Sequence, residues 1–199
     1  MTLEQLQWAA LWALAPLVLA FLDAPFRTLG QQYLVHRWGE RLVLFSIELN
    51  LLMLWALTRL VLGHDVGLFP DVLRLPMAAL GLVIVWAGTV FTVWGKLALG
   101  RQFTASFAIR KDHTLVTRGP YAITRHPIYT GLLAMAIGAA LVLDSGLTLG
   151  FTALLVLPFW FHTAIEEPLL EQHFGEEWKL YRAKVPRLIP GWKRGAPSR

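Results

Sequence analysis

The sequence predicts an all-α integral membrane protein with about five transmembrane helices and a C-terminal amphipathic helix in the membrane interface. The first observation behind this prediction is composition, since 56% of the 199 residues are hydrophobic and only 16% are charged. A soluble domain carries about 25% charged residues. The second observation is that the apolar residues form long, separate stretches. The third is that Lys and Arg gather in alternate loops, as in multi-pass membrane proteins.

Five apolar stretches are the predicted membrane helices, and they cover residues 5–22, 41–62, 77–99, 128–143 and 147–165. The first three approach the ~20 residues that cross the hydrocarbon core of a bilayer. The last two are shorter and are joined only by Asp144, Ser145 and Gly146, which predicts a tight helical hairpin whose turn Asp144 caps. The sequence shows no internal repeat, so we expect a single domain over residues 1–199.

The basic residues predict an orientation in the membrane. The 23–40 loop, the 100–127 segment and the tail after residue 165 are rich in Lys and Arg, whereas the 63–76 loop has only Arg74. Because basic loops stay on the cytosolic side, we expect the N-terminus outside and the 100–127 segment and the tail inside, in an inner or plasma membrane. The net charge of +5 is then a sign of contact with anionic lipid and not of nucleic-acid binding.

The N-terminus and the tail need separate interpretations. No Lys or Arg precedes Arg27, so the first stretch is expected to be a retained helix and not a signal peptide. In the tail, apolar residues recur at helical spacing between charged ones, which predicts the interfacial amphipathic helix. Pro168 suits the first turn of that helix, and Gly175 is a point at which it divides into two pieces. The apolar positions are Leu170, Phe174, Trp178, Tyr181 and Val185.

The polar residues that suit chemistry lie in two places, 100–131 and 162–174. Pro127 is a good first residue for a helix and leaves His126 at the helix mouth, where N–H groups favour a carboxylate. Tyr121 and Tyr129 supply aromatic faces and hydroxyls that suit an adenine ring or a sulfonium cation. The alternative is a basic loop that docks on lipid headgroups, with the tyrosines as interface anchors.

Acidic residues supply the second half of the candidate site. Glu166 lies four residues after His162 on one helix face and is suited to hold an ammonium group, whereas solvation at the interface suits Glu167. Glu48 lies within the second predicted helix and is a candidate substrate contact, with a protonated structural acid as the alternative. The chain has no cysteine and no metal-ligand spacing, so we expect no thiolate nucleophile and no metal site.

Two linked motifs carry a family resemblance. The segment HTLVTRGPYAITRHPIYTG, followed by EEPLLEQHFGEEWKLYRAKVPRLIPG, resembles the isoprenylcysteine carboxyl methyltransferase family, and the related membrane phospholipid methyltransferases share part of it. The resemblance covers roughly 95–191, about half the chain. It implies an S-adenosylmethionine-dependent methyltransferase whose cofactor-binding part is 100–199, with the active site at the cytosolic membrane face. The implied acceptor is a lipophilic carboxylate or thiol.

The resemblance also implies roles for single residues. Family members that methylate prenylcysteine have an Arg four residues before the cofactor-binding Glu, where it serves the substrate, and this chain has His162 there. His162 and Glu166 are therefore the expected catalytic residues, and His162 is an expected substrate contact. Glu48 is the other expected substrate contact, on the ground of its place within a predicted helix and not of the resemblance. The implied cofactor contacts are His113, Thr114, Leu115, Val116, Tyr121, His126, Pro127, Ile128, Tyr129 and Glu166.

Two other functions stay open on the sequence alone. One is a phospholipid amine N-methyltransferase, which would need a neutral amine as its acceptor. The other is a non-catalytic membrane scaffold or transporter, although a transporter should show paired repeats and helices broken at mid-bilayer. The expected partners are a small lipophilic or lipid substrate and the bilayer, with no nucleic acid, and the oligomeric state is open.

Overall fold

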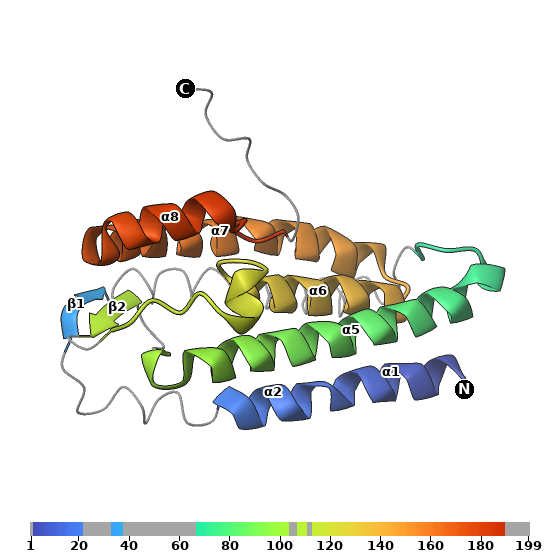
Figure 1. Cartoon of the computed structure of the whole chain (residues 1–199). Coiled ribbons are helices and arrows are strands. Elements are labelled where there is room, and N and C mark those ends of the chain that lie inside the picture. The colour runs from blue at the N-terminus through green and yellow to red at the C-terminus, as the bar shows by residue number, and fades with distance from the viewer. Residues whose placement is uncertain (1, 22–32, 38–66, 104–106, 111–112, 190–199) are drawn as a thin grey trace.

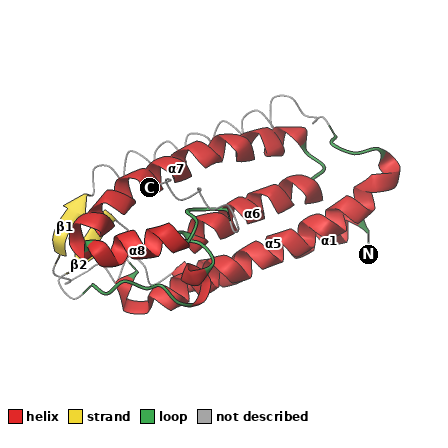
Figure 2. Cartoon of the chain, turned by 45° about the horizontal axis from the view of Figure 1, so that its top comes forward, coloured by secondary structure: helices red, strands yellow, loops and turns green. Residues whose placement is uncertain are grey.

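The computed structural model describes residues 2–21, 33–37, 67–103, 107–110 and 113–189, which form a bundle of long helices with a small sheet at one end (Figure 1). Figure 2 shows α8 turning back beside the end of α7. The two strands were not predicted and are an addition to a mainly helical chain. The helices are α1 (Leu3–Trp12), α2 (Leu14–Phe21), α5 (Asp71–Leu99), α6 (Pro127–Val142), α7 (Gly146–Phe174) and α8 (Glu176–Lys184), with 3-10 turns η1 (Gly100–Gln102) and η2 (Gly119–Ala122) and strands β1 (Tyr33–Arg37) and β2 (Phe107–Arg110).

The apolar stretches correspond to helices wherever the structure describes them. The first forms α1 and α2, and the others form α5, α6 and α7, while 41–62, which includes Glu48, lies outside the described residues. Within the described part, Asp71–Gln102 and Gly146–Phe174 are long and apolar enough to cross a membrane. Helix α6 has 16 residues, and at about 1.5 Å per residue it falls short of the ~30 Å hydrocarbon core.

Helices α5 and α6 pack with their backbones in contact, through glycines seven residues apart. A Cβ atom built on Gly81 would lie 2.6 Å from the carbonyl oxygen of Gly138, and one built on Gly88 would lie 2.6 Å from that of Gly131. Further along α5, Gly95 lies against Pro127, the first residue of α6. This antiparallel contact fixes where α6 begins, and small residues that let two backbones approach are typical of the contacts between membrane helices.

The α6–α7 turn differs in detail from the prediction. Ser145 caps α7, since its hydroxyl accepts the Thr148 N–H at 2.9 Å. Asp144 has a φ of 48°, a region in which Asp is tolerated, and its Oδ1 accepts the N–H groups of Leu68 and Phe69 at 2.8 and 3.1 Å. Its Oδ2 lies 2.8 Å from Arg74 Nε. Asp144 therefore ties the turn to the segment before α5 and does not cap the helix.

The expectation that a new helix starts at Pro168 is wrong. Helix α7 continues through Pro168 to Phe174, because Ile165, Leu169 and Leu170 pack on Ile109 of β2 on both sides of the proline. That packing outweighs the one backbone hydrogen bond that a proline removes. The predicted break at Gly175 is confirmed, since Gly175 has a φ of 54° and separates α7 from α8.

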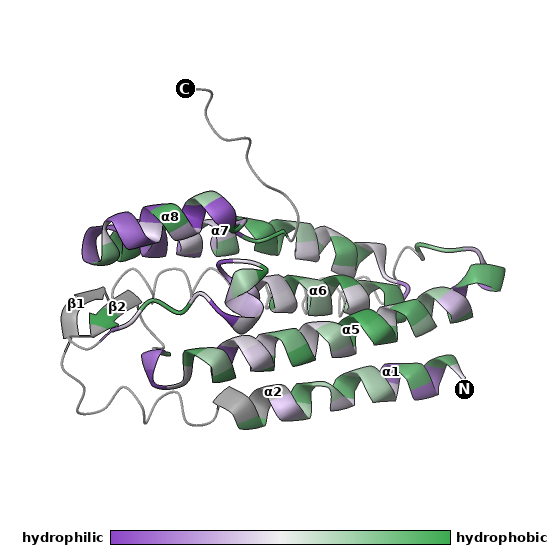
Figure 3. Ribbon diagram, viewed as in Figure 1, coloured by the Kyte–Doolittle hydropathy of each residue, from purple (hydrophilic) through white to green (hydrophobic). Residues whose placement is uncertain are grey.

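One end of the bundle is polar. Figure 3 shows hydrophilic residues on α8, at the end of α7 and around η1, while α5 and α6 are largely hydrophobic along their length. Strands β1 and β2 pair antiparallel at this end, with Val35 opposite Ile109 and Arg37 opposite Phe107. The pairing joins the 23–40 loop to the 100–127 segment. We call this region the polar end; it comprises η1, β1, β2, η2, the end of α7 and α8.

Replacing Gly88 with Ala is expected to lower the free energy of unfolding by about 1–3 kcal/mol, because the added methyl group overpacks the α5–α6 contact. Gly150→Ala in α7 is the matched control, since a Cβ there meets no atom within 4 Å. The control should leave stability unchanged or raise it by up to about 1 kcal/mol through helix propensity. Thermal unfolding in detergent measures both variants, and equal stabilities would contradict the backbone contact.

Candidate functional site

The two motifs meet at the polar end, at the start of α6. His126 precedes Pro127 and is buried, with its Nδ1 atom 3.6 Å from Glu166 Oε2 and its Nε2 atom 3.2 Å from Glu167 Oε1. Its ring therefore lies between two neighbouring acids of α7. Because successive residues on a helix point about 100° apart, the two carboxylates approach this ring from different sides. The Glu166 side chain is 37% exposed, whereas that of Glu167 is 3% exposed.

Glu167 is not solvated at an interface, as the sequence suggested, but is a buried ion-pair centre. Arg125 donates to its Oε1 from Nε at 3.1 Å and from Nη2 at 2.9 Å. Arg187 donates from Nε to Oε1 at 3.0 Å and from Nη2 to Oε2 at 2.7 Å. A buried carboxylate is tolerated when its oxygens are this well satisfied. Glu167 thereby joins α7 to the start of α6 and to the C-terminal part of the chain.

Residues Val185–Leu188, which we call the C-terminal strap, pair with the backbone around His126. The Arg125 and His126 N–H groups donate to the carbonyls of Pro186 and Arg187, at 2.9 and 3.2 Å. The Thr124 hydroxyl donates to the Arg187 carbonyl at 2.6 Å, and the Thr130 hydroxyl donates to that of Leu188 at 2.6 Å. The strap therefore lies along the residues that lead into α6.

Tyr121 closes one side of the site from η2. It is buried, and its carbonyl accepts the Tyr181 hydroxyl of α8 at 2.7 Å. Burial raises the pKa of Tyr121 well above its ordinary value, and the nearby charge of Glu166 raises it further. Tyr121 therefore keeps its hydroxyl proton and is available as a donor.

Tyr129 and His162 belong to an aromatic cluster next to His126. The Tyr129 ring stacks with those of His126 and Phe159, at centroid distances of 5.8 and 5.4 Å, and lies 5.5 Å from the His162 ring. His162 is fully buried (0% exposed), so in this structure its ring supports Tyr129 and does not face an open site. Tyr129 likewise uses its ring for packing, where the sequence suggested a free aromatic face for a ligand.

The other predicted cofactor contacts surround this cluster. The His113 ring lies edge-on to Phe174 at the end of α7, at 5.7 Å, and the Thr114 hydroxyl accepts from Gln102 Nε2 at 3.1 Å. The 113–116 segment therefore lies between η1 and the end of α7, with Leu115 and Val116 half-buried. Pro127 is buried, and Pro127 and Ile128 pack against Gly95. Glu48 is outside the described residues.

The residues present fit a zwitterionic, amino-acid-like group. No side chain caps the start of α6, and a helix start of this kind favours a carboxylate. Glu166 supplies a partly exposed carboxylate that suits an ammonium group, and it lies on the same His126 ring. Within the described ranges, no group of three or more His, Cys, Asp or Glu residues is placed to hold a metal ion.

Sequence reasoning misjudged Glu167, which it assigned to solvation at the interface, and it missed Arg125, Arg187 and Gln102. The Oε1 atom of Gln102 is buried without a hydrogen-bond partner among the described residues, so it is an acceptor available to a ligand amino group. The one sequence signal for the ion-pair cluster was the presence of an Arg beside His126 and another in the VPRLIPG tail. That signal did not show which acid the two arginines share.

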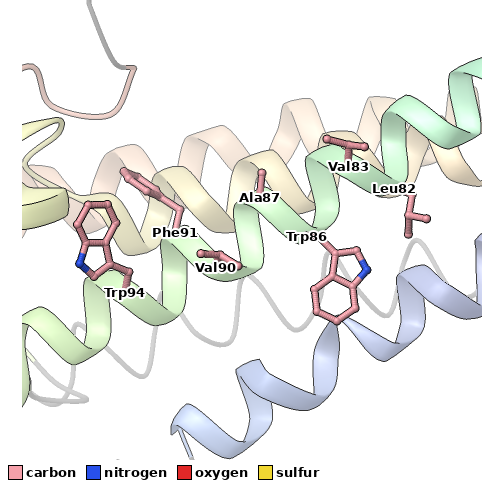
Figure 4. Close-up of a pocket in the computed structure, with 7 residues that line it drawn as sticks. All are labelled: Leu82, Val83, Trp86, Ala87, Val90, Phe91 and Trp94. Atoms are coloured by element: carbon pink, nitrogen blue, oxygen red, sulfur yellow. The ribbon is translucent and has the colours of Figure 1, made fainter.

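An apolar hollow runs along α5 and ends close to η2 (Figure 4). Trp94 lies at that end, and its ring is 3.6 Å from the position of a Cβ atom built on Gly119. Gly119 precedes Tyr121 by two residues, so the hollow leads from the apolar length of α5 towards the polar end. Its lining residues are Leu82, Val83, Trp86, Ala87, Val90, Phe91 and Trp94.

Comparisons with known proteins agree with the resemblance seen in the sequence. Residues 76–177 match the family model described as phospholipid methyltransferase. A probable protein-S-isoprenylcysteine O-methyltransferase of Oryza sativa subsp. indica is 37% identical over 113 residues, which is 55% of this chain and 59% of that protein. The matched family region includes most of α5, all of α6, and His126, Glu166 and Glu167, and it ends before the C-terminal strap.

Two further relatives carry the same kind of name. The protein-S-isoprenylcysteine O-methyltransferase of Schizosaccharomyces pombe is 42% identical over 94 residues, 46% of this chain and 40% of that protein. That of Xenopus laevis is 34% identical over 134 residues, 63% of this chain and 45% of that protein. The chain therefore spans about six-tenths or less of the length of these curated relatives.

Replacing Arg125 with Lys is expected to destabilise the protein by about 1–3 kcal/mol, because one ammonium group cannot reproduce the fork of bonds that Arg125 makes. Besides its bonds to Glu167, Nη1 donates to the carbonyls of Arg182 and Val185 at 2.9 and 2.8 Å. Arg182→Lys is the control, since Arg182 pairs with Glu171 on the exposed surface, and it should change stability by less than about 0.5 kcal/mol. Thermal unfolding measures the stability of both variants. An equal loss of stability in the two would contradict the buried ion-pair cluster.

Proposed function

The chain belongs to the phospholipid methyltransferase family, and on that premise we propose that it is a membrane methyltransferase that uses S-adenosylmethionine. The observation that carries the proposal is the convergence of His126, at the uncapped start of α6, with Glu166 of α7. The two residues come from motifs about 40 residues apart. They bring N–H donors, which favour an anionic group, and a carboxylate, which favours a cationic group, to one place next to a buried tyrosine.

Each part of the site has a proposed task in holding the cofactor. The N–H groups at the start of α6 bind its carboxylate, Glu166 binds its ammonium group, and Tyr121 donates a hydrogen bond. Residues 113–116, with Gln102 beside them, contact its adenosine part. S-adenosylmethionine supplies a methyl group already activated by the sulfonium sulfur, so the chain mainly has to position it for in-line attack by the acceptor.

The proposed acceptor is a lipophilic carboxylate or thiol, as the names of the relatives suggest. The hollow along α5 supports an apolar acceptor that reaches the polar end from within the bilayer. A phospholipid amine is the second candidate, because the matching family model is described as phospholipid methyltransferase. His162 is proposed to act on the acceptor side through Tyr129, at the inner end of the aromatic cluster, and Glu48 stays a proposed acceptor contact.

We further propose a single methyltransferase unit that spans residues 1–199 with about five membrane helices and an outward N-terminus. Two contacts support the alternating topology. The pairing of β1 with β2 supports a common side of the membrane for the 23–40 loop and the 100–127 segment. The bonds from Leu68 and Phe69 to Asp144 bring the 63–76 loop to the α6–α7 turn, at the other end of the helices. The proposed membrane is an inner or plasma membrane.

The purified protein is expected to bind S-adenosylhomocysteine saturably in calorimetry, and His126→Ala and Glu166→Ala should each weaken the binding. The loss of a charge-assisted hydrogen bond of about 1.5–3 kcal/mol corresponds to roughly 10-fold or more in affinity. Glu171→Ala is the control, because Glu171 pairs with Arg182 away from His126. If the folded protein gives no binding heat, the cofactor proposal is wrong. If all three substitutions weaken binding equally, the assignment of His126 and Glu166 to the binding site is wrong.

Reporter fusions test the proposed topology. Fusions after Asp144 and after Arg199 should report opposite compartments, with the Arg199 fusion in the cytosol, because the tail carries many of the basic residues. A fusion in the 63–76 loop is the internal check and should agree with the Asp144 fusion. The same compartment for Asp144 and Arg199 would overturn the arrangement.

A further inference from the structure

We propose that Glu167 is a positioning residue of this site, whose carboxylate orients the His126 ring and fastens the C-terminal strap over the start of α6. The part that concerns the strap stands on the contacts of this chain alone. The part that concerns the cofactor rests on the proposed function, in which the groups around His126 bind S-adenosylmethionine.

The surroundings of Glu167 leave its carboxylate with a fixed set of partners. It is 3% exposed, so water does not solvate it. Its two oxygens accept four hydrogen bonds from Arg125 and Arg187 and a fifth from His126, at 2.7 to 3.2 Å. The three donors come from two parts of the chain, about 20 and 40 residues from Glu167. One carboxylate therefore determines how α7, the start of α6 and the strap lie together.

The contact with His126 fixes how that ring is used. A carboxylate only accepts hydrogen bonds, so the proton of the 3.2 Å contact belongs to His126 Nε2. The ring is then turned so that Nδ1 points to Glu166, 3.6 Å away. Stacking with Tyr129 holds the plane of the ring. Glu167 thereby orients His126 from the side opposite the proposed ligand.

The strap is fastened in two ways, and Glu167 supplies one of them. Backbone and threonine hydrogen bonds attach it to residues 124–130. The Arg187 side chain leaves the strap, packs over the Trp160 ring at 4.6 Å and donates twice to Glu167. Arg125 completes the link, since it binds both Glu167 and the carbonyl of Val185. Removal of the Glu167 charge leaves both arginines without their shared partner and loosens the strap.

Thiol labelling tests the strap without any cofactor. The chain has no cysteine, so Leu188→Cys introduces a single thiol at a buried position of the strap, since Leu188 is 8% exposed. In this background, Glu167→Gln should raise the maleimide labelling rate about tenfold or more, because local opening exposes the thiol. Glu171→Gln, which removes an acid of the same helix that binds Arg182 on the surface, should leave the rate within about twofold.

Two further variants separate a positioning role of Glu167 from a general effect on folding. Arg187→Gln changes the partner in the strap, and Glu167→Asp shortens the acidic side chain. Arg187→Gln loosens the strap but keeps the contact between Glu167 and His126, so labelling should rise while S-adenosylhomocysteine affinity falls less than in Glu167→Gln. Glu167→Asp keeps the charge and should restore part of both properties. In protein labelled with 15N-histidine, the Nε2 signal of His126, identified by its loss in His126→Ala, should shift in Glu167→Gln and stay in place in Glu171→Gln.

The outcomes separate this inference from the proposed function. Faster labelling with a shifted His126 signal supports the positioning role, even if the wild-type protein binds no S-adenosylhomocysteine, in which case only the cofactor proposal fails. An unchanged labelling rate in folded Glu167→Gln overturns the fastening of the strap. If Glu167→Gln does not fold, Arg187→Gln probes the same contact, and an unchanged rate there overturns it as well. An unshifted His126 signal overturns the orienting role.

Discussion

The burial of one carboxylate is the constraint on which the site depends. Glu167 is 3% exposed and remains compatible with the fold only while Arg125, His126 and Arg187 surround it. Those partners come from the start of α6 and from the strap, so satisfying a single charge brings three segments together. The same carboxylate is proposed to give the His126 ring its direction. The charge that stabilises the polar end therefore also arranges the groups that are proposed to hold the cofactor.

The glycine contact between α5 and α6 supplies the other fixed point. Because Gly88 and Gly131 allow the backbones to touch, α6 lies at one depth along α5, with Pro127 against Gly95. The proline leaves His126 outside the helix, where its N–H bonds the Arg187 carbonyl of the strap. Apolar packing along the bundle thus sets the position of the helix mouth, and the ion pairs at its end set the orientation of the side chains.

Sequence patterns predicted the features that depend on local composition. The apolar stretches gave α5, α6 and α7, because burial in lipid requires long apolar runs, and Gly175 marked the α7–α8 break. Pro168 misled, since Ile109, on which the neighbouring Leu169 packs, lies far away in the sequence. The pairing of His126 with Glu166 came from linked motifs. Glu167 was misjudged because its partners lie 20 to 42 residues away, and no local pattern shows which acid turns inward.

Glu166 and Glu167 show how a helix assigns different tasks to adjacent, chemically identical residues. Their side chains point about 100° apart, so Glu167 faces Arg125 and Arg187, and Glu166 faces a partly exposed position beside Tyr121. Arg125 and Arg187 direct their bonds to Glu167, which leaves the Glu166 carboxylate available to a cationic group from outside the chain. An exchange of these roles would place an unneutralised acid in the interior and fill the site with arginine. The helix register at the end of α7, set by the packing of Leu169 on Ile109, is therefore as important to the proposed chemistry as the acids themselves.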